Sequence, residues 1–233
     1  MKTQQKSKIK FLLIFICALI LPFDLVFISG NWLWPEGWIF GIWLLGLCSL
    51  NLIYMYRYSP ALLEERYRVI RPGSGGQKRW DKYLIYISVP SLVLWLAIMP
   101  LDAQRFAWTT NFPIWLEPLG LLLLIGSAFF MFRSFKDNPF LSPLVRIQVE
   151  RDQKVVSTGV YGFVRHPLYL GDVLLFLGAP LLLGSLYGFI IGLYLSILFV
   201  VRIMGEEKML LEELEGYVAY TQRVKYRLIP YVW

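Results

Sequence analysis

The sequence predicts an all-α, polytopic integral membrane protein with about six transmembrane helices. Apolar residues make up 57% of the 233 residues and the mean hydropathy is positive, so a water-soluble fold would expose far too much hydrocarbon. Several apolar runs approach the roughly 17 to 25 residues that a spanning helix needs. Nearly all Lys and Arg fall in alternate connections between these runs. The three observations favour one membrane domain over residues 1–233.

The first four predicted membrane helices occupy residues 11–29, 38–56, 83–101 and 115–132. The first of them follows a lysine-rich start and could be mistaken for a signal peptide. No cleavage site of small residues follows it, and Trp32 and Trp34 are typical of a helix that reaches the membrane interface. We therefore expect an uncleaved membrane helix.

Two further membrane helices are expected between Tyr169 and Met204. A break at Gly184-Ser185 leaves the fifth helix short, over residues 169–183, which indicates a tilted or partly embedded helix. After the sixth helix the sequence predicts an amphipathic helix that lies along the inner surface. Its apolar face is formed by residues at helical spacing: Leu210, Leu214, Tyr217, Val218 and Thr221.

The charge pattern predicts the orientation of the chain. Every Lys and Arg except Arg105 lies before residue 11, within residues 57–82 or 133–165, or after residue 201. By the positive-inside rule these segments and both termini are cytoplasmic. The net charge of +7 is therefore mainly a topology signal, with attraction to anionic headgroups as a secondary role, and it does not indicate nucleic-acid binding.

Cysteine and histidine usage excludes several kinds of site. Cys17 and Cys48 both lie in apolar runs, so the sequence indicates neither a disulfide framework nor a thiolate metal site. His166 is the only histidine, which excludes a multi-histidine metal centre within one chain. We expect no metal.

The two long basic loops are where function is expected, because the loops on the other side are short. In the first, mixed charges over residues 62–68 favour a solvated continuation of the second helix, while Arg79-Trp80-Asp81 has the alternative role of gripping a substrate or headgroup. In the second, alternating residues 144–150 precede a charged turn. Such a segment can fold as an ordered lid over the membrane face.

The densest group of polar residues lies over residues 157–171, followed after the last apolar run by Glu206-Glu207. Adjacent carboxylates can hold ribose hydroxyls or an ammonium group, and an arginine can pair with a carboxylate or phosphate. Tyrosine faces at Tyr161 and Tyr169 can stack on an adenine or meet a sulfonium through cation–π attraction. These residue types suit a charged cofactor at the cytoplasmic face.

Three blocks in this order carry a family resemblance: residues 159–171 around Arg165-His166-Pro167, residues 202–210 around Glu206-Glu207, and residues 217–230. The region resembles the superfamily of isoprenylcysteine carboxyl methyltransferases and phospholipid methyltransferases. Within the motif region, 133–233, residues 138–140 and 148–150 are similar to bacterial members, which implies the bacterial inner membrane. Residues 1–132 supply N-terminal helices in which no motif is found.

The resemblance implies S-adenosylmethionine as cofactor and a lipophilic substrate that approaches from the bilayer. It implies catalytic roles for Arg165, His166 and Arg223. It implies cofactor contacts from Tyr161, His166, Pro167, Tyr169, Gly171, Glu206, Glu207, Tyr217 and Tyr220.

The sequence is compatible with more than one methyl acceptor. A prenylcysteine carboxylate, the favoured acceptor, is ionised at pH 7 and needs no base, whereas an amine or thiol of a phospholipid or other lipid needs His166 or a glutamate to take a proton. Membrane sterol and enone reductases that use a nicotinamide cofactor share the His-Pro-x-Tyr-x-Gly-Asp run, which makes a reductase the alternative. Glu206-Glu207 is the methyltransferase form of the discriminating pair. A non-enzymatic membrane scaffold is a third reading, and the oligomeric state is open.

Overall fold

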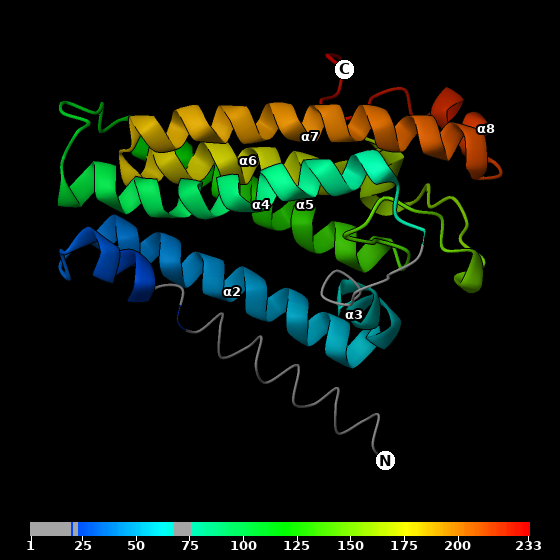
Figure 1. The fold of residues 1–233 in the computed structure, drawn as a ribbon, viewed down its shortest axis with the longest axis horizontal. Coiled ribbons are helices and arrows are strands. Elements are labelled where there is room, and N and C mark those ends of the chain that lie inside the picture. Colours follow the sequence, from blue (N-terminus) through cyan, green and yellow to red (C-terminus); the bar gives the residue numbers. More distant parts are fainter. Residues whose placement is uncertain (1–19, 21–22, 68–75) are drawn as a thin grey trace.

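Long helices that run side by side form most of the protein (Figure 1). The structure, a computed structural model, describes residues 20, 23–67 and 76–233. The long helices are α2 (Pro35–Tyr58), α4 (Arg79–Pro100), α5 (Leu116–Asp137), α6 (Pro167–Leu183) and α7 (Leu186–Glu213). Within the described ranges no strand occurs. The predicted all-α membrane fold is confirmed.

Four of these helices are long and apolar enough to cross a membrane. They are α2, α5, α7 and α4 together with its π-helical extension Leu101–Arg105. Helix α6 has 17 residues, about 26 Å at 1.5 Å per residue, so it is short as predicted. The first predicted helix, residues 11–29, lies largely outside the described residues, of which 23–29 are helical.

The helices pack in a connected bundle in which α5 lies against α6, α6 against α7, and α7 against α4. Glycines bring α5 and α6 into backbone contact: a Cβ on Gly120 would lie 2.4 Å from the Leu182 nitrogen and 2.6 Å from the Gly178 oxygen. Between the helices, Trp95, Phe176 and Leu195 are part of the largest buried apolar cluster. Small residues at helix contacts are typical of membrane bundles, where close approach replaces the hydrophobic effect as the source of stability.

One end of the bundle is tied together by Asp102, which is fully buried. Its carboxylate accepts hydrogen bonds from the Thr109 hydroxyl (2.8 Å) and backbone N–H (2.9 Å), from the Ser185 hydroxyl (2.7 Å) and from the Tyr187 N–H (3.2 Å). The end of α4 is thereby joined to the turn between α6 and α7.

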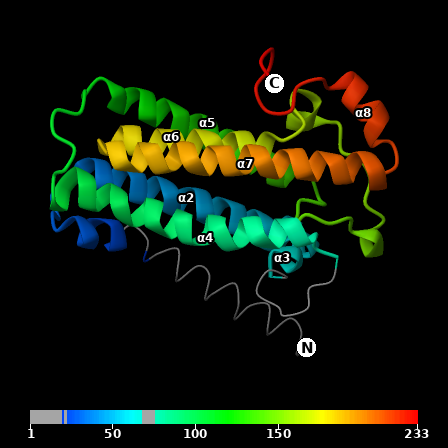
Figure 2. The ribbon, with the colours of Figure 1, turned by 45° about the horizontal axis from the view of Figure 1, so that its top comes forward.

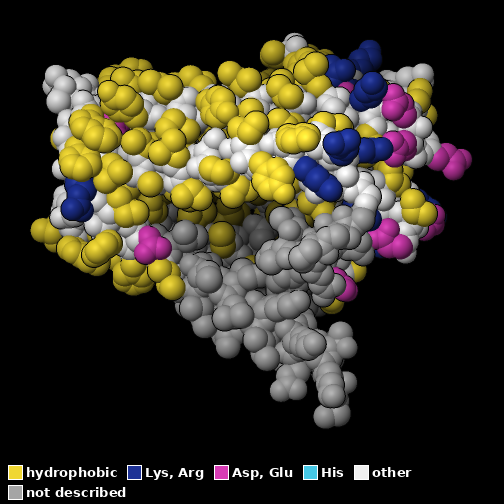
Figure 3. All heavy atoms as spheres, viewed as in Figure 1, with side chains coloured by type: hydrophobic (Ala, Val, Ile, Leu, Met, Phe, Trp, Pro, Cys, Tyr) yellow, Lys and Arg dark blue, Asp and Glu magenta, His cyan; other side chains and the backbone are white. Residues whose placement is uncertain are grey.

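Charged side chains gather at the opposite end. In Figure 3 hydrophobic side chains cover the length of the helices, and most Lys and Arg lie at the end that carries α3 (Pro60–Tyr67) and α8 (Tyr217–Arg223). Figure 2 shows that end from a second side, with the connecting loops around it. The one-sided charge pattern read from the sequence therefore corresponds to one end of the bundle.

Two local predictions at this end were wrong. The amphipathic helix expected over residues 210–221 is broken, because Gly216 adopts a left-handed conformation (φ +81°) between α7 and α8. Val218 is exposed as a result, whereas Tyr217 and Tyr220 are buried. The charged segment after α2 is also not simply solvated: α3 is a separate helix, and its Glu65 is buried.

Candidate functional site

The first motif block forms a tight loop that begins with a left-handed glycine. Gly159 has φ +60°, and a Cβ there would lie 2.0 Å from the Asp137 carboxylate. That carboxylate, at the end of α5, accepts a hydrogen bond from the Val160 N–H at 3.0 Å. A 3-10 turn over Gly159–Gly162 follows, so the loop is anchored on α5 before it reaches the Arg-His-Pro sequence.

His166 caps α6, with Pro167 as the first residue of the helix. The backbone N–H groups of Arg165 and His166 donate to the carbonyls of Tyr226 (3.0 Å) and Arg227 (2.9 Å). The third motif block therefore holds the first one in place through main-chain hydrogen bonds.

Glu207, on α7, is the ionic centre beneath this loop and is 3% exposed. It pairs with Arg165 (Nη2 to Oε2, 3.1 Å) and with Arg227, and its Oε1 lies 3.4 Å from the Nε2 atom of His166. Arg165 donates its remaining bonds to the carbonyls of Val224 (2.8 Å) and Lys225 (2.9 Å). The ion pair between Arg165 and Glu207 therefore joins the three motif blocks.

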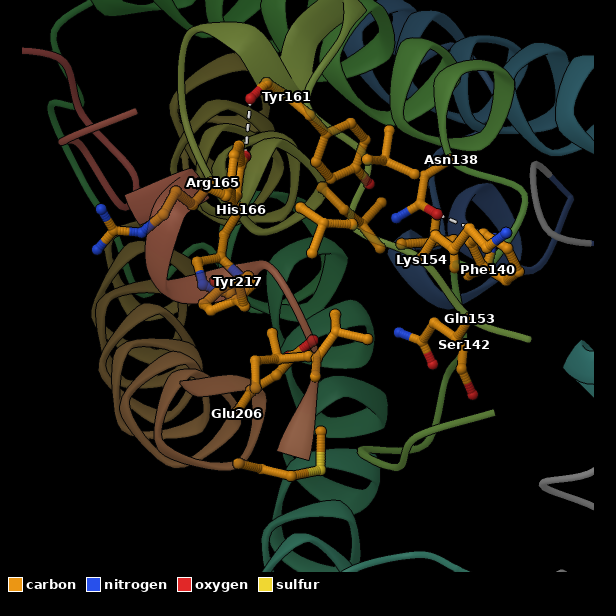
Figure 4. A pocket seen from close by; sticks show the side chains of 18 of the residues that line it. Asn138, Phe140, Ser142, Gln153, Lys154, Tyr161, Arg165, His166, Glu206 and Tyr217 are labelled. Atoms are coloured by element: carbon orange, nitrogen blue, oxygen red, sulfur yellow. Dashed lines mark hydrogen bonds between the residues drawn. The ribbon is translucent and has the colours of Figure 1, made fainter. Parts of the chain in front are cut away.

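A pocket lies beside this junction, with about 800 Å³ of space that is continuous with solvent. Figure 4 shows side chains from the motif loop, from α7 and α8 and from the segment after α5 arranged around it. Eight predicted site residues line it: Tyr161, Arg165, His166, Pro167, Tyr169, Glu206, Tyr217 and Tyr220.

Three predicted site residues lie elsewhere. Glu207 is behind the pocket wall, in the ion cluster described above. Gly171 is a packing residue, because a Cβ there would lie 2.7 Å from the Met131 side chain on α5. Arg223 is exposed at the end of α8 and does not line the pocket. The guanidinium of Arg165 also points away from the cavity (Figure 4).

Glu206 is the carboxylate that faces the pocket. It accepts a hydrogen bond from the Tyr169 hydroxyl at 2.6 Å. Arg202, one turn earlier on α7, lies over the Tyr169 ring at 5.8 Å and forms a salt bridge of 2.8 Å with Asp81 on α4. The Asp81 and Arg202 pair was not anticipated from the sequence, because 121 residues separate the two.

The segment after α5 covers one side of the pocket with Asn138, Phe140, Ser142 and neighbouring residues. This segment contains no strand. It is anchored by the side chain of Arg146, which is 6% exposed. Arg146 forms two hydrogen bonds of 2.9 Å with Glu65 on α3 and one of 2.6 Å with Glu150. Burial lowers the pKa of Arg146, but the hydrogen bonds to the two carboxylates together raise it more, so this arginine remains charged.

Two buried polar atoms in the pocket wall have no hydrogen-bond partner among the described residues: Nε2 of His166 and the hydroxyl of Tyr217. The His166 atom is near Glu207 but is not aligned for a hydrogen bond. Burial raises the pKa of Tyr217 above its usual range, with the Glu207 charge adding to the effect, so the hydroxyl stays protonated. Buried groups of this kind are normally satisfied, and their position indicates a polar ligand in the pocket.

Comparison with known proteins identifies the motif region. Residues 116–215 match the model of the phospholipid methyltransferase family. The chain is 33% identical over 106 residues to protein-S-isoprenylcysteine O-methyltransferase of Saccharomyces cerevisiae, covering 45% of this chain and 44% of that protein. The superfamily resemblance is confirmed.

Sterol reductases are also among the relatives. Delta(14)-sterol reductases of Mus musculus and Schizosaccharomyces pombe are each 33% identical, over 136 and 105 residues, covering 50% and 44% of this chain. The matched regions span 32% and 25% of the two reductases, so the chain covers well under half the length of these curated relatives.

The overall fold is similar to that of the solved eukaryotic intramembrane Ras methyltransferase, an isoprenylcysteine carboxyl methyltransferase. The TM-score is 0.53, and the match covers 96% of this chain and 86% of that one at 21% identity. At this identity the likeness establishes the fold alone.

Proposed function

We propose that this protein transfers a methyl group from S-adenosylmethionine to a lipophilic acceptor at the cytoplasmic membrane face. The observation that carries the proposal is the pocket lined by Glu206, His166 and four tyrosines, in which the Tyr217 hydroxyl has no partner among the described residues. When bound, S-adenosylmethionine supplies a methyl carbon on a sulfonium, and transfer leaves the electron pair of the broken bond on sulfur.

The residues present fit this group. Glu206 offers a carboxylate to hydroxyls or an ammonium group, and Tyr161, Tyr169 and Tyr217 offer ring faces to an adenine or a sulfonium. The Tyr217 hydroxyl supplies hydrogen-bonding capacity that the described residues leave unused. Most of the catalytic task in such a displacement is alignment and exclusion of water, which a pocket covered by the Asn138 to Val156 segment can provide.

The predicted site residues fall into two groups: those that position the motif blocks and one that faces the pocket. Arg165 and Glu207 are positioning residues, because their charges are committed to each other and to the third block. His166 is the residue of the Arg-His-Pro sequence whose ring lines the pocket, while its Nε2 atom lies 3.4 Å from Glu207. It would orient an acceptor carboxylate, or take the proton if the acceptor is an amine or thiol.

The favoured acceptor is an isoprenylcysteine-like carboxylate, with a phospholipid amine or a thiol as alternatives. Support comes from the yeast relative and from the apolar helices that surround the pocket end of the bundle. The cytoplasmic placement of both termini belongs to the same proposal and rests on the loop charges. The bacterial inner membrane rests on the resemblance of residues 138–140 and 148–150 to bacterial members.

Retention of radiolabelled S-adenosylmethionine by the purified protein tests the proposal. Glu206→Gln should weaken retention by roughly 10-fold, the usual loss for a hydrogen bond to a charged group. Glu212→Gln, a matched change at an exposed position on the same helix, should leave it unchanged. Absence of retention by the wild-type protein would overturn the assignment. In a second experiment the protein is given labelled S-adenosylmethionine and a total lipid extract, and mass analysis of the labelled lipid identifies the product.

The relatives make a nicotinamide-dependent reductase the second candidate. The pocket gives it less support, since the two buried cations in its lining, Arg146 and Arg165, are already paired with carboxylates, and the remaining one, Lys154, is exposed. A phosphorylated dinucleotide would need free cations. Retention of NADPH in place of S-adenosylmethionine by the purified protein would favour the reductase over the methyltransferase.

A further inference from the structure

Asp81, in the first turn of α4, is a fully buried carboxylate whose two oxygens bind different parts of the chain. Its Oδ1 atom accepts a hydrogen bond from Nε of Arg202 at 2.8 Å. Its Oδ2 atom accepts one from the backbone N–H of Val145 at 3.0 Å and one from the Gln77 side chain at 2.9 Å. The carboxylate of the Arg79-Trp80-Asp81 sequence, a candidate for gripping a substrate or headgroup, is therefore bound to other residues of the protein.

The ion pair of Asp81 and Arg202 fastens the segment that covers the pocket, residues 138–156, here called the cover segment. Both partners bond to its backbone: Asp81 accepts from the Val145 N–H, and Nη2 of Arg202 donates to the Pro143 carbonyl at 2.7 Å. Hydrogen bonds to charged groups are stronger than those between neutral groups. The ion pair therefore holds a short stretch of the cover segment against both α4 and α7.

The same ion pair contacts two walls of the pocket. Ser142 and Leu144 of the cover segment line the pocket, on either side of the backbone carbonyl that Arg202 binds. On the α7 side the Arg202 guanidinium lies 5.8 Å from the centre of the Tyr169 ring, and the Tyr169 hydroxyl donates to Glu206 at 2.6 Å. Tyr169 and Glu206 line the pocket as well. A shift of the ion pair would therefore be passed to two surfaces that enclose a bound molecule.

We propose that Asp81 is a positioning residue for the donor site: through Val145 and Arg202 it keeps the cover segment closed over bound S-adenosylmethionine. This inference rests on the proposed function and adds a residue from α4, a helix that contributes no described residue to the pocket lining itself. A closed cover segment slows departure of the donor and excludes water from the pocket. Asp81 therefore acts on how long the donor stays bound, through the residues that it holds.

The test measures how fast labelled S-adenosylmethionine leaves the full chain in detergent after an excess of unlabelled donor is added. Asp81→Asn should accelerate release by about tenfold, because its amide turns N–H donors toward the donors of Arg202 or Val145 and one charge-assisted hydrogen bond is lost.

Asp102→Asn is the matched control. Asp102 is also fully buried and also accepts backbone N–H groups, but it lies at the other end of the bundle. This substitution should lower the melting temperature and leave the rate of donor release unchanged. A general loss of stability would instead accelerate release in both variants.

Hydrogen exchange of the peptide that contains Pro143 and Val145, measured without donor, separates this inference from the proposed function. Exchange should be about tenfold faster in Asp81→Asn than in the wild type, and unchanged in Asp102→Asn. Absence of donor retention by the wild type would overturn the proposed function. Wild-type exchange in Asp81→Asn, or equal acceleration in Asp102→Asn, would overturn the role of Asp81 whatever the wild type retains.

If Asp81→Asn does not fold, Arg202→Lys provides a second variant. It keeps a positive charge beside Asp81 but lacks the planar fork whose Nε and Nη2 atoms bind Asp81 and the Pro143 carbonyl at once. Arg202→Lys should also release the donor faster than the wild type. Release at the wild-type rate would count equally against the inference.

Discussion

Tyr217 and Tyr220 are neighbours on α8 that differ in how their hydroxyls are used. The Tyr220 hydroxyl donates to the Tyr161 carbonyl at 2.7 Å, whereas the Tyr217 hydroxyl has no partner among the described residues. Tyr220→Phe should therefore lower stability by about 0.5–1.5 kcal/mol. Tyr217→Phe should leave the melting temperature unchanged but weaken S-adenosylmethionine binding by roughly 2- to 10-fold. The opposite pattern would show that Tyr217 has no ligand.

Alkaline pH should destabilise the pocket end of the bundle. Burial raises the pKa of Tyr161, Tyr217 and Tyr220 above the ordinary value near 10. The folded state therefore binds more protons than the unfolded state above that pH. Stability contributed by these groups is fully present below about pH 10 and falls as pH rises beyond it. Melting curves from pH 8 to 11 should show this loss, and Tyr217→Phe should reduce it.

At the residue scale the motif predicted the pocket better than it predicted individual roles. Eight of the motif residues line the pocket, because short motif spacings on loops and helix ends fix which side chains are near one another. Whether Glu206 or Glu207 faces the pocket depends on which arginines reach α7 from elsewhere in the chain. Adjacent residues on a helix point in different directions, so the sequence could not distinguish the two.

At the scale of helices, the contact between α5 and α6 should be intolerant of any added side chain. Gly120→Ala would place its Cβ against the backbone of α6, which cannot move without shifting the whole helix. The expected loss is about 1–3 kcal/mol, seen as a lower melting temperature in detergent.

Gly46→Ala is the matched control, because nothing lies within 4 Å of a Cβ at Gly46 on α2. This substitution should be neutral or stabilise the protein by up to about 1 kcal/mol through helix propensity. Equal effects of the two substitutions would contradict the packing described for α5 and α6.

Helices were predictable where apolar length alone decides them. The shortness of α6 followed from Gly184, which takes the left-handed conformation (φ +71°) that ends a helix. Gly216 has the same role between α7 and α8, but the helical spacing of the residues around it masked the break. The pairing of Glu65 with Arg146 was beyond prediction because 81 residues separate them.

For the whole molecule, the distribution of charge predicts which end faces the cytoplasm. In a chain whose Cys17 and Cys48 are replaced by serine, Glu212→Cys should react with a membrane-impermeant maleimide only in inside-out vesicles. Thr110→Cys, exposed near the other end of the bundle, should react only in right-side-out cells. Labelling with the opposite pattern would reverse the topology and move the pocket to the outer face.

The hydrogen bonds around Asp102 have a mechanical consequence. They fasten α4 to the turn between α6 and α7 at the end remote from the pocket, and they are shielded from water. Because the salt bridge between Asp81 and Arg202 also joins α4 to α7 near the pocket, these helices are fastened to each other toward both ends of the bundle. Any separation of the two helices near the pocket therefore requires the Asp81–Arg202 salt bridge to break, while the buried Asp102 hydrogen bonds stay intact.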